Sequence, residues 1–156
     1  MQNDQNAPFF VDTEVIRLTK NGIWMSDETE ITHEPTRRLF AKSLKKKDDG
    51  YYLAIGKETK KIVIEDTAYF ITRIDGDMNS GLTLSLSNEA KEKLVPSTLK
   101  YKPGRLTCLV LNQTEEAKFL HAAYFDILRN LEEDDSSYYL TFNNHKTVLL
   151  QKGDHA

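Results

Sequence analysis

The side chains with the clearest potential for binding chemistry are cationic and aromatic. Arg37 and Arg38 fall in the first turn of a predicted helix, which follows the hairpin that carries Trp24. Arginine side chains at the positive end of a helix can hold a phosphate, and an indole face can stack on a flat ring. Lys118 and His121 would lie one turn apart on a second predicted helix. The alternative is that both groups are ordinary solvated helix faces.

If the two groups act together, they suit a phosphate joined to a flat ring, because charged donors and aromatic area are then combined. We expect an anionic, nucleotide-like ligand in a cleft between two halves of the chain. The expected ligand-binding residues are Trp24, Arg37, Arg38, Lys118, His121 and Tyr124.

Recognisable catalytic motifs are absent from the sequence. It contains no serine elbow, phosphate-binding loop or dinucleotide glycine motif, and its four histidines lack metal-binding spacing. Glu65 and Asp66 would point to opposite faces of a strand, so they cannot work as an acid–base pair. Cys108, in the apolar run LTCLVL, is expected to be buried and unreactive. We therefore expect a binding module with no cofactor and no metal, and a hydrolase is an alternative.

Composition limits the cellular setting and the class of partner. The chain has 156 residues, enough for one domain or two very small ones, and 39% of them are hydrophobic. The net charge of −3 argues against nucleic-acid polymers and anionic membranes as partners. A single cysteine fits a reducing compartment, and the start MQNDQNAPFF lacks the features of a secretory signal. We therefore expect a cytoplasmic protein with no membrane span.

The first half of the sequence predicts a hairpin, a helix and a run of strands. Residues 15–25 form two β-prone runs around Asn21-Gly22, which favours a type I′ turn. A helix with Thr32 or Glu34 near its start is predicted to continue through the three lysines at 45–47. The segments YYLAI, KIVIED, AYFITRI and LTLSLS are predicted strands.

The second half predicts two helices, a strand and a hairpin. Residues 88–94 read as a short helix capped by Ser87, and RLTCLVLN reads as a strand. The longest predicted helix starts at Asn112 or Thr114 and ends near Leu131, with acidic residues in its first turn. A hairpin with Asn143-Asn144 as its turn completes the chain.

An internal repeat suggests how these elements are organised. The stretch LFAKSLKKKDDGYYLAIGKETKKIVI is similar to YFDILRNLEEDDSSYYLTFNNHKTVLL: a helix, two aspartates, a tyrosine pair and two strands. A chance match of common elements is the alternative to duplication. With duplication, the fold is α+β, in two similar halves at residues 8–75 and 76–152, each a helix on an antiparallel sheet, with a ligand cleft at the seam.

Several of these motifs also resemble a known family. Gly22, Trp24, RRLFAKSL, DDGYYL, Glu58, IEDTAYF and EAKFLHAAYFDIL follow one another as in the bacterial family called domain of unknown function 1285. A weaker similarity links the chain to the uncharacterised family UPF0598. The resemblance implies two related α+β units, the second pleckstrin-homology-like, an inter-domain surface for a nucleotide-like ligand, and a place in signalling. It implies no reaction.

One departure from that family affects the expected ligand contacts. His121 stands where the family tends to carry arginine, so an anion contact there would weaken as the pH rises through the histidine range, near about 6.5.

The main alternative function is a protein–protein interaction module that docks a partner on a sheet face or edge strand. The tyrosine pairs Tyr51-Tyr52 and Tyr138-Tyr139 favour it, because each pair places one ring on each face of its strand.

Overall fold

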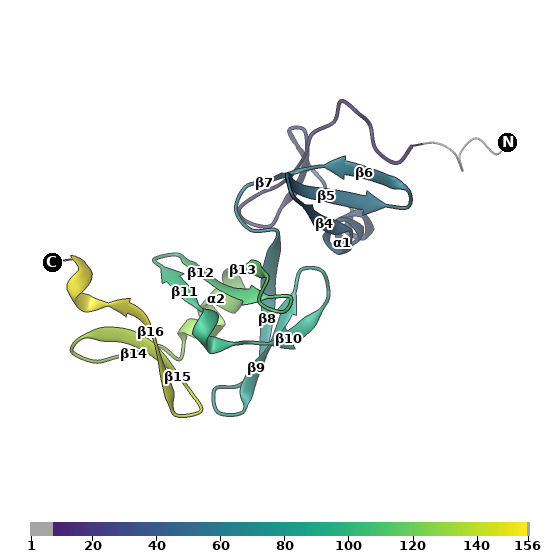
Figure 1. Ribbon diagram of the computed structural model, residues 1–156. Coiled ribbons are helices and arrows are strands. Elements are labelled where there is room, and N and C mark those ends of the chain that lie inside the picture. Colours follow the sequence, from purple (N-terminus) through teal and green to yellow (C-terminus); the bar gives the residue numbers. More distant parts are fainter. Residues whose placement is uncertain (1–7, 156) are drawn as a thin grey trace. The chain divides into compact units, whose positions relative to one another are not determined.

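The structure is a computed structural model that describes residues 8–155, and its fold is α+β with most of the ordered backbone in strands. The chain divides between Ala68 and Tyr69 into two compact units, here called unit 1 and unit 2 (Figure 1). The sequence placed the boundary after residue 75, which lies inside strand β8 (Tyr69–Asp77).

Unit 1 begins with a four-stranded sheet in the order β3-β2-β1-β7. Strand β1 pairs antiparallel with β2 and parallel with β7. The strands are β1 (Ile16–Leu18), β2 (Trp24–Ser26), β3 (Thr29–Glu30) and β7 (Val63–Ile64).

The predicted β1–β2 hairpin is confirmed, but its turn is of another type. The Gly22 N–H donates to the Thr19 carbonyl at 3.0 Å, and the Thr19 N–H donates to the Ile23 carbonyl at 2.9 Å. Gly22 has a φ of 82°, and Asn21 is not in the left-handed region. A type I′ turn needs a positive φ at both central residues, which is not the case here. The observed connection is a three-residue loop, in which a type I turn is followed by a left-handed glycine.

The first helix is shorter than the sequence predicted. Helix α1 (Glu34–Lys42) ends at the C-cap Ser43, whose hydroxyl donates to the Leu39 carbonyl at 2.6 Å. The lysines at 45–47 belong instead to strand β4 (Leu44–Lys47), which pairs antiparallel with β5 (Gly50–Ile55). Cross-strand pairing outweighs local helix propensity here, because it places lysine ammonium groups over tyrosine rings.

Strand β6 (Glu58–Lys61) completes an antiparallel β4-β5-β6 sheet. Asp49, in the β4–β5 turn, accepts hydrogen bonds from the Tyr52 hydroxyl at 2.9 Å and from the Lys61 ammonium at 3.3 Å. These contacts hold the pKa of Asp49 below its usual value, with the Tyr52 bond as the largest cause. The core of unit 1 is formed by Phe10, Ile16, Leu18, Trp24, Phe40, Ala41, Leu53 and Ile62.

Unit 2 is built on a six-stranded sheet in the order β10-β9-β8-β13-β12-β11. Strand β13 runs parallel to β8, and the other neighbours are antiparallel. Strands β10 and β11 are therefore its two edges. The further strands are β9 (Gly81–Leu86), β10 (Lys91–Lys93), β11 (Lys100–Lys102), β12 (Arg105–Val110) and β13 (Glu115–Phe119), with a short 3₁₀ turn at Pro96–Thr98.

Two helices predicted for this half are wrong in part or in whole. The segment predicted as a short helix at 88–94 contains edge strand β10, paired with β9. The longest predicted helix begins only at His121, because residues 115–119 form β13 between β8 and β12. Ala117 and Phe119 are buried with Lys118 between them, which is the period of a strand and not of a helix.

After helix α2 (His121–Leu128), unit 2 ends in an antiparallel β14-β15-β16 sheet. The predicted turn is confirmed, since Asn143 and Asn144 have φ values of 48° and 66°, as a type I′ turn requires. The strands are β14 (Glu132–Glu133), β15 (Ser137–Phe142) and β16 (His145–Gln151), followed by a 3₁₀ turn at Lys152–His155.

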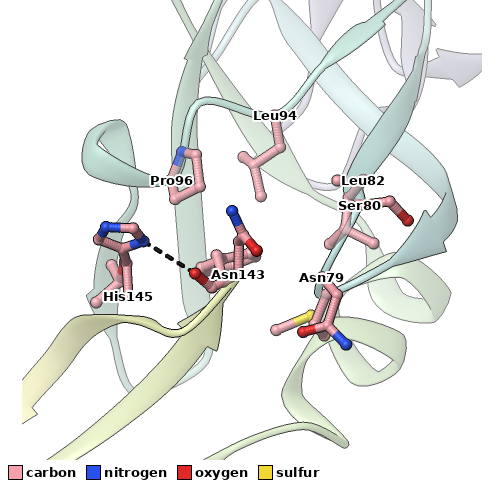
Figure 2. A pocket seen from close by; sticks show the side chains of 11 residues that line it. Asn79, Ser80, Leu82, Leu94, Pro96, Asn143 and His145 are labelled. Atoms are coloured by element: carbon pink, nitrogen blue, oxygen red, sulfur yellow. Dashed lines mark hydrogen bonds between the residues drawn. The ribbon is translucent and has the colours of Figure 1, made fainter.

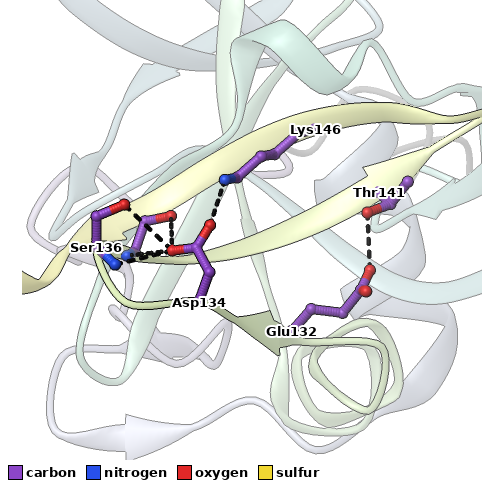
Figure 3. A network of polar contacts seen from close by, with 6 residues as sticks. Glu132, Asp134, Ser136, Thr141 and Lys146 are labelled. Carbon is purple, nitrogen blue, oxygen red and sulfur yellow. Dashed lines mark hydrogen bonds and ion pairs between the residues drawn. The ribbon is translucent and has the colours of Figure 1, made fainter.

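Asp134 organises the β14–β15 turn (Figure 3). Its carboxylate accepts hydrogen bonds from the Ser136 and Ser137 N–H groups, at 2.9 Å and 2.8 Å, and from the Lys146 ammonium. The Lys146 bond is the largest reason why the pKa of Asp134 lies well below its usual range. Lys146 also lies over the Tyr139 ring, 4.4 Å from its centre.

None of the helices in the described range is long and apolar enough to cross a membrane.

Candidate functional site

Trp24 belongs to the core of unit 1. It is only 4% exposed and meets Phe40 of α1 edge-on, with ring centres 5.4 Å apart and planes at 74°. The alternating pattern of β2 turns the indole inward. A ring enclosed in this way stabilises the hairpin against the helix and does not present a face for stacking.

Arg37 and Arg38 lie in α1, as the sequence predicted. The Arg37 guanidinium pairs with the Glu34 carboxylate one turn earlier in the same helix. Arg38 is exposed and also has an interaction partner. Salt bridges within an exposed helix contribute a few tenths of a kcal/mol, roughly. The contact between Arg37 and Glu34 therefore stabilises α1 itself, and Arg38 lies on the exposed surface of that helix.

Lys118 and His121 do not share a helix, which corrects the sequence prediction. Lys118 lies in β13 opposite Thr107 of β12, whereas His121 is the first residue of α2. The His121 ring packs edge-on against Phe125, with centres 5.0 Å apart. The chain changes from strand to helix between the two residues, so their spacing in sequence does not bring them onto one surface.

Tyr124 lies next to a cavity of unit 2 through its contacts with the β11–β12 turn. Its hydroxyl accepts a hydrogen bond from the Gly104 N–H at 3.1 Å, which ties helix α2 to the β11–β12 turn. It is also hydrogen-bonded to the Tyr101 hydroxyl. Burial, with this bond as a second cause, raises the pKa of Tyr101. Tyr124 is thus a positioning residue that fixes the Tyr101 side chain.

Tyr101 lines a cavity of about 480 Å³, here called the basic cavity. Two lysines and an arginine surround one carboxylate in its lining, so the local charge is positive in a chain whose net charge is −3. Strands β11, β12, β13 and β16 contribute its walls. The lining residues are Leu99, Lys100, Tyr101, Lys102, Arg105, Glu116 and Leu149.

The carboxylate in the basic cavity is held in place by two donors. The Arg105 guanidinium lies 3.4 Å from a Glu116 carboxylate oxygen, and the Thr107 hydroxyl donates to the other oxygen at 3.0 Å. Both donors come from β12, and Glu116 comes from the neighbouring strand β13. Glu116 therefore orients the arginine and offsets only part of the positive charge.

This cavity is not among the sites that the sequence predicted. Its local signal is the alternation Lys100-Tyr101-Lys102 before Pro103-Gly104, a pattern that predicts a short strand with both cations on one side and a turn after it. The placement of Glu116 and Leu149 beside this strand depends on sheet order and could not be read from spacing.

A second cavity, of about 320 Å³, lies between the tips of two hairpins of unit 2 (Figure 2). The Asn143 N–H donates to the Met78 carbonyl at 2.9 Å and joins the two turns. Asn79, Ser80 and His145 are among the polar residues on its walls, and His145 contacts the Asn143 carbonyl. Lysine and arginine do not line it, so it suits an anion less well than the basic cavity does.

Cys108 is buried in β12, as predicted. Burial, with the Glu92 carboxylate as a second cause, raises the pKa of its thiol to about 12. Since only the thiolate reacts, we expect a thiol reagent at pH 8 to label the native protein very slowly and the urea-unfolded protein rapidly and stoichiometrically. Rapid labelling of the native protein would contradict this assignment.

Comparison with known proteins supports a family and a fold. The model of the N-terminal domain of the domain of unknown function DUF1285 matches residues 4–67. A search of functionally curated proteins finds no match.

Two solved structures resemble the chain. A DUF1285 family protein from Silicibacter pomeroyi DSS-3 is 18% identical with a TM-score of 0.68, covering 89% of this chain and 81% of that one. One from Shewanella baltica OS155 is 19% identical with a TM-score of 0.58, covering 76% of this chain and 94% of that one. The chain therefore matches the DUF1285 N-terminal domain over residues 4–67, and its fold is similar to that of two DUF1285 family proteins over most of its length.

Proposed function

We propose that this protein is a non-catalytic binding module with a place in signalling, and that unit 2 holds a small anionic ligand in the basic cavity. The observation that carries this proposal is the grouping of Lys100, Lys102 and Arg105 around one hollow of about 480 Å³. This volume falls in the range of about 300–1,000 Å³ that is usual for small-molecule sites.

The walls of the basic cavity match an anion in charge and in shape. Two flexible ammonium groups can adjust to a phosphate or carboxylate, and the guanidinium offers donors in a fixed plane. Glu116 keeps the arginine oriented when the cavity holds no ligand. Tyr101, fixed by Tyr124, adds an aromatic wall. The direct ligand contacts expected for Arg37, Arg38, Lys118 and His121 stay predictions, whereas the Trp24 ring is enclosed in the core of unit 1.

We also propose that the two units arose by duplication. In each unit a helix is followed by a three-stranded antiparallel meander, β4-β5-β6 or β14-β15-β16. Each meander has an aspartate in its first turn that accepts from a lysine of its third strand, and a lysine ammonium lies over a tyrosine ring of its middle strand. The clusters are Asp49, Tyr52 and Lys61, with Lys47 over the ring, and Asp134, Tyr139 and Lys146. The pleckstrin-homology-like form of unit 2 stays a prediction.

Thermal unfolding of the full chain with pyrophosphate tests the binding proposal. We expect stabilisation that rises with concentration, toward about 2.7 kcal/mol at a hundred times the dissociation constant. The double variant Lys100→Gln/Lys102→Gln should bind at least about tenfold more weakly, because it loses two charge-assisted contacts.

Edge strand β10 supplies a matched control for that variant. Its sequence Lys91-Glu92-Lys93 has the same exposure pattern as Lys100-Tyr101-Lys102, at the opposite edge of the same sheet. Lys91→Gln/Lys93→Gln removes the same charge and should leave pyrophosphate binding unchanged. Equal weakening in both double variants, or no stabilisation of the parent protein, would contradict the proposal and favour the protein-interaction alternative.

A further inference from the structure

A third cavity, of about 280 Å³, adjoins the basic cavity and is here called the apolar cavity. Tyr101 and Leu149 line both cavities, so these two side chains form the boundary between them. The apolar cavity is lined by Tyr101, Leu131, Tyr138, Leu149 and Leu150.

The two cavities follow a line where two sheet edges meet. Strand β11 is an edge of the six-stranded sheet and β16 is an edge of the β14-β15-β16 sheet. The two strands contact each other without pairing as neighbours in one sheet. Because the two strands are not joined in one sheet, side chains separate them, and the two cavities lie between these side chains.

A bulge in β16 gives the apolar cavity its walls. Tyr138 of β15 pairs with Leu150 and the next residue, Tyr139, pairs with Val148, so Leu149 is an extra residue in β16. Adjacent residues of a regular strand point to opposite faces, but a bulge redirects a side chain. This is why Leu149 and Leu150 both line the same cavity. Bulges are common next to binding sites.

The two cavities differ sharply in chemistry. All the side chains that line the apolar cavity are leucines or tyrosines, whereas the basic cavity adds two lysines and an arginine. Leu131 remains 41% exposed at the rim. Covering such a side chain with an apolar group removes hydrocarbon surface from water and is favourable. An anionic group and an apolar group of one ligand can therefore be satisfied side by side.

We propose that the ligand of unit 2 is a monomeric amphiphilic anion, with its phosphate or carboxylate group in the basic cavity and an unbranched apolar chain in the apolar cavity. This inference rests on the proposed function and narrows it, because it replaces the flat ring of a nucleotide with a hydrocarbon chain. Charge complementarity favours one orientation of the ligand, since Lys100, Lys102 and Arg105 line only the basic cavity. Lys152 lies over the Tyr138 ring beside the apolar cavity, but its ammonium group is paired with the Glu133 carboxylate.

Calorimetry with alkyl phosphates tests this inference on the full chain. The probes are inorganic phosphate and ethyl, butyl, hexyl and octyl phosphate, each below the concentration at which it forms micelles. Each buried methylene should tighten binding by about fourfold until the cavity is full, after which the affinity should level off. An affinity that does not change with chain length overturns the inference.

Two variants separate the parts of the site. Leu131→Ser should reduce the gain per methylene and leave the binding of inorganic phosphate unchanged. Leu39→Ser is the matched control, because Leu39 is similarly exposed, at 38%, and lies in α1 of unit 1. It should bind every probe like the parent protein. Equal losses of octyl phosphate binding in both serine variants overturn the inference.

The same series distinguishes failure of the inference from failure of the proposed function. If Lys100→Gln/Lys102→Gln weakens inorganic phosphate binding but chain length has no effect, only the amphiphilic ligand is excluded. If octyl phosphate binds with unchanged affinity to this double variant, the basic cavity is not the anion site and both proposals fail. Sedimentation with anionic phospholipid vesicles, without binding of monomeric octyl phosphate, would assign the apolar rim to a membrane surface and also overturn the inference.

Discussion

Replacing Phe70 with alanine is expected to lower the free energy of unfolding of unit 2 by about 3–5 kcal/mol. Phe70 is 1% exposed and lies in β8, which pairs with β9 on one side and β13 on the other. Removing its ring would leave a void at the centre of the sheet that supports both cavities, and well-packed neighbours relax only partly into such a void. Urea unfolding monitored by circular dichroism measures the effect.

Phe125 provides the matched control for this substitution. It lies in the same unit, in α2, but 51% of its surface is exposed. Phe125→Ala removes the same atoms and also breaks the ring contacts with His121 and Tyr124. Apart from those contacts, it should lower the free energy of unfolding by less than about 1 kcal/mol. Equal destabilisation by the two substitutions would show that Phe70 does not occupy the core position described.

Gly76→Ala is expected to be the most damaging glycine substitution in unit 2. Gly76 has a φ of 102°, and a Cβ atom there would lie 2.3 Å from the Gly81 carbonyl oxygen across the β8–β9 hairpin. The backbone conformation alone costs a non-glycine residue about 1–3 kcal/mol, and the contact with a backbone oxygen adds to it because that oxygen cannot move without breaking the strand pairing. A fall in the urea midpoint measures the total.

Gly104→Ala separates these two contributions. Gly104 also has a positive φ, of 81°, but no atom lies within 4 Å of the position of its added Cβ. Its substitution should therefore show only the backbone cost and destabilise unit 2 less than Gly76→Ala does. If Gly104→Ala proves the more damaging of the two, the close approach of the β8 and β9 backbones is not a constraint on the fold.

Residue types and their local spacing were sufficient to predict several elements of the fold. Asn143-Asn144 predicted its type I′ turn, because asparagine tolerates the left-handed region at both central positions. Asn21-Gly22 predicted a hairpin but not its turn type, since one left-handed glycine satisfies a three-residue loop. The apolar run around Cys108 predicted a buried strand and an unreactive thiol, because burial of the run also desolvates the sulfur.

Where a segment is compatible with both helix and strand, the tertiary structure determined which of the two forms. The segments 45–47 and 115–119 contain good helix formers, yet both form strands, because pairing with β5, β8 and β12 satisfies their backbone groups. In the segment 115–119 this pairing also buries Ala117 and Phe119. The sequence predicted that the Trp24 ring stacks on a ligand, but its side chain points inward from β2 and belongs to the core.

The candidate ligand site also depends on the tertiary structure. Sequence composition and the tyrosine-rich repeat favoured a binding module, but they could not bring Tyr101 beside Leu149 or Arg105 beside Glu116. Those contacts follow from strand order, from the meeting of the β11 and β16 edges, and from one extra residue in β16. Such features join residues far apart in the chain, and hydrophobic periodicity carries no information about them, because it records which face of an element is buried and not which element covers it.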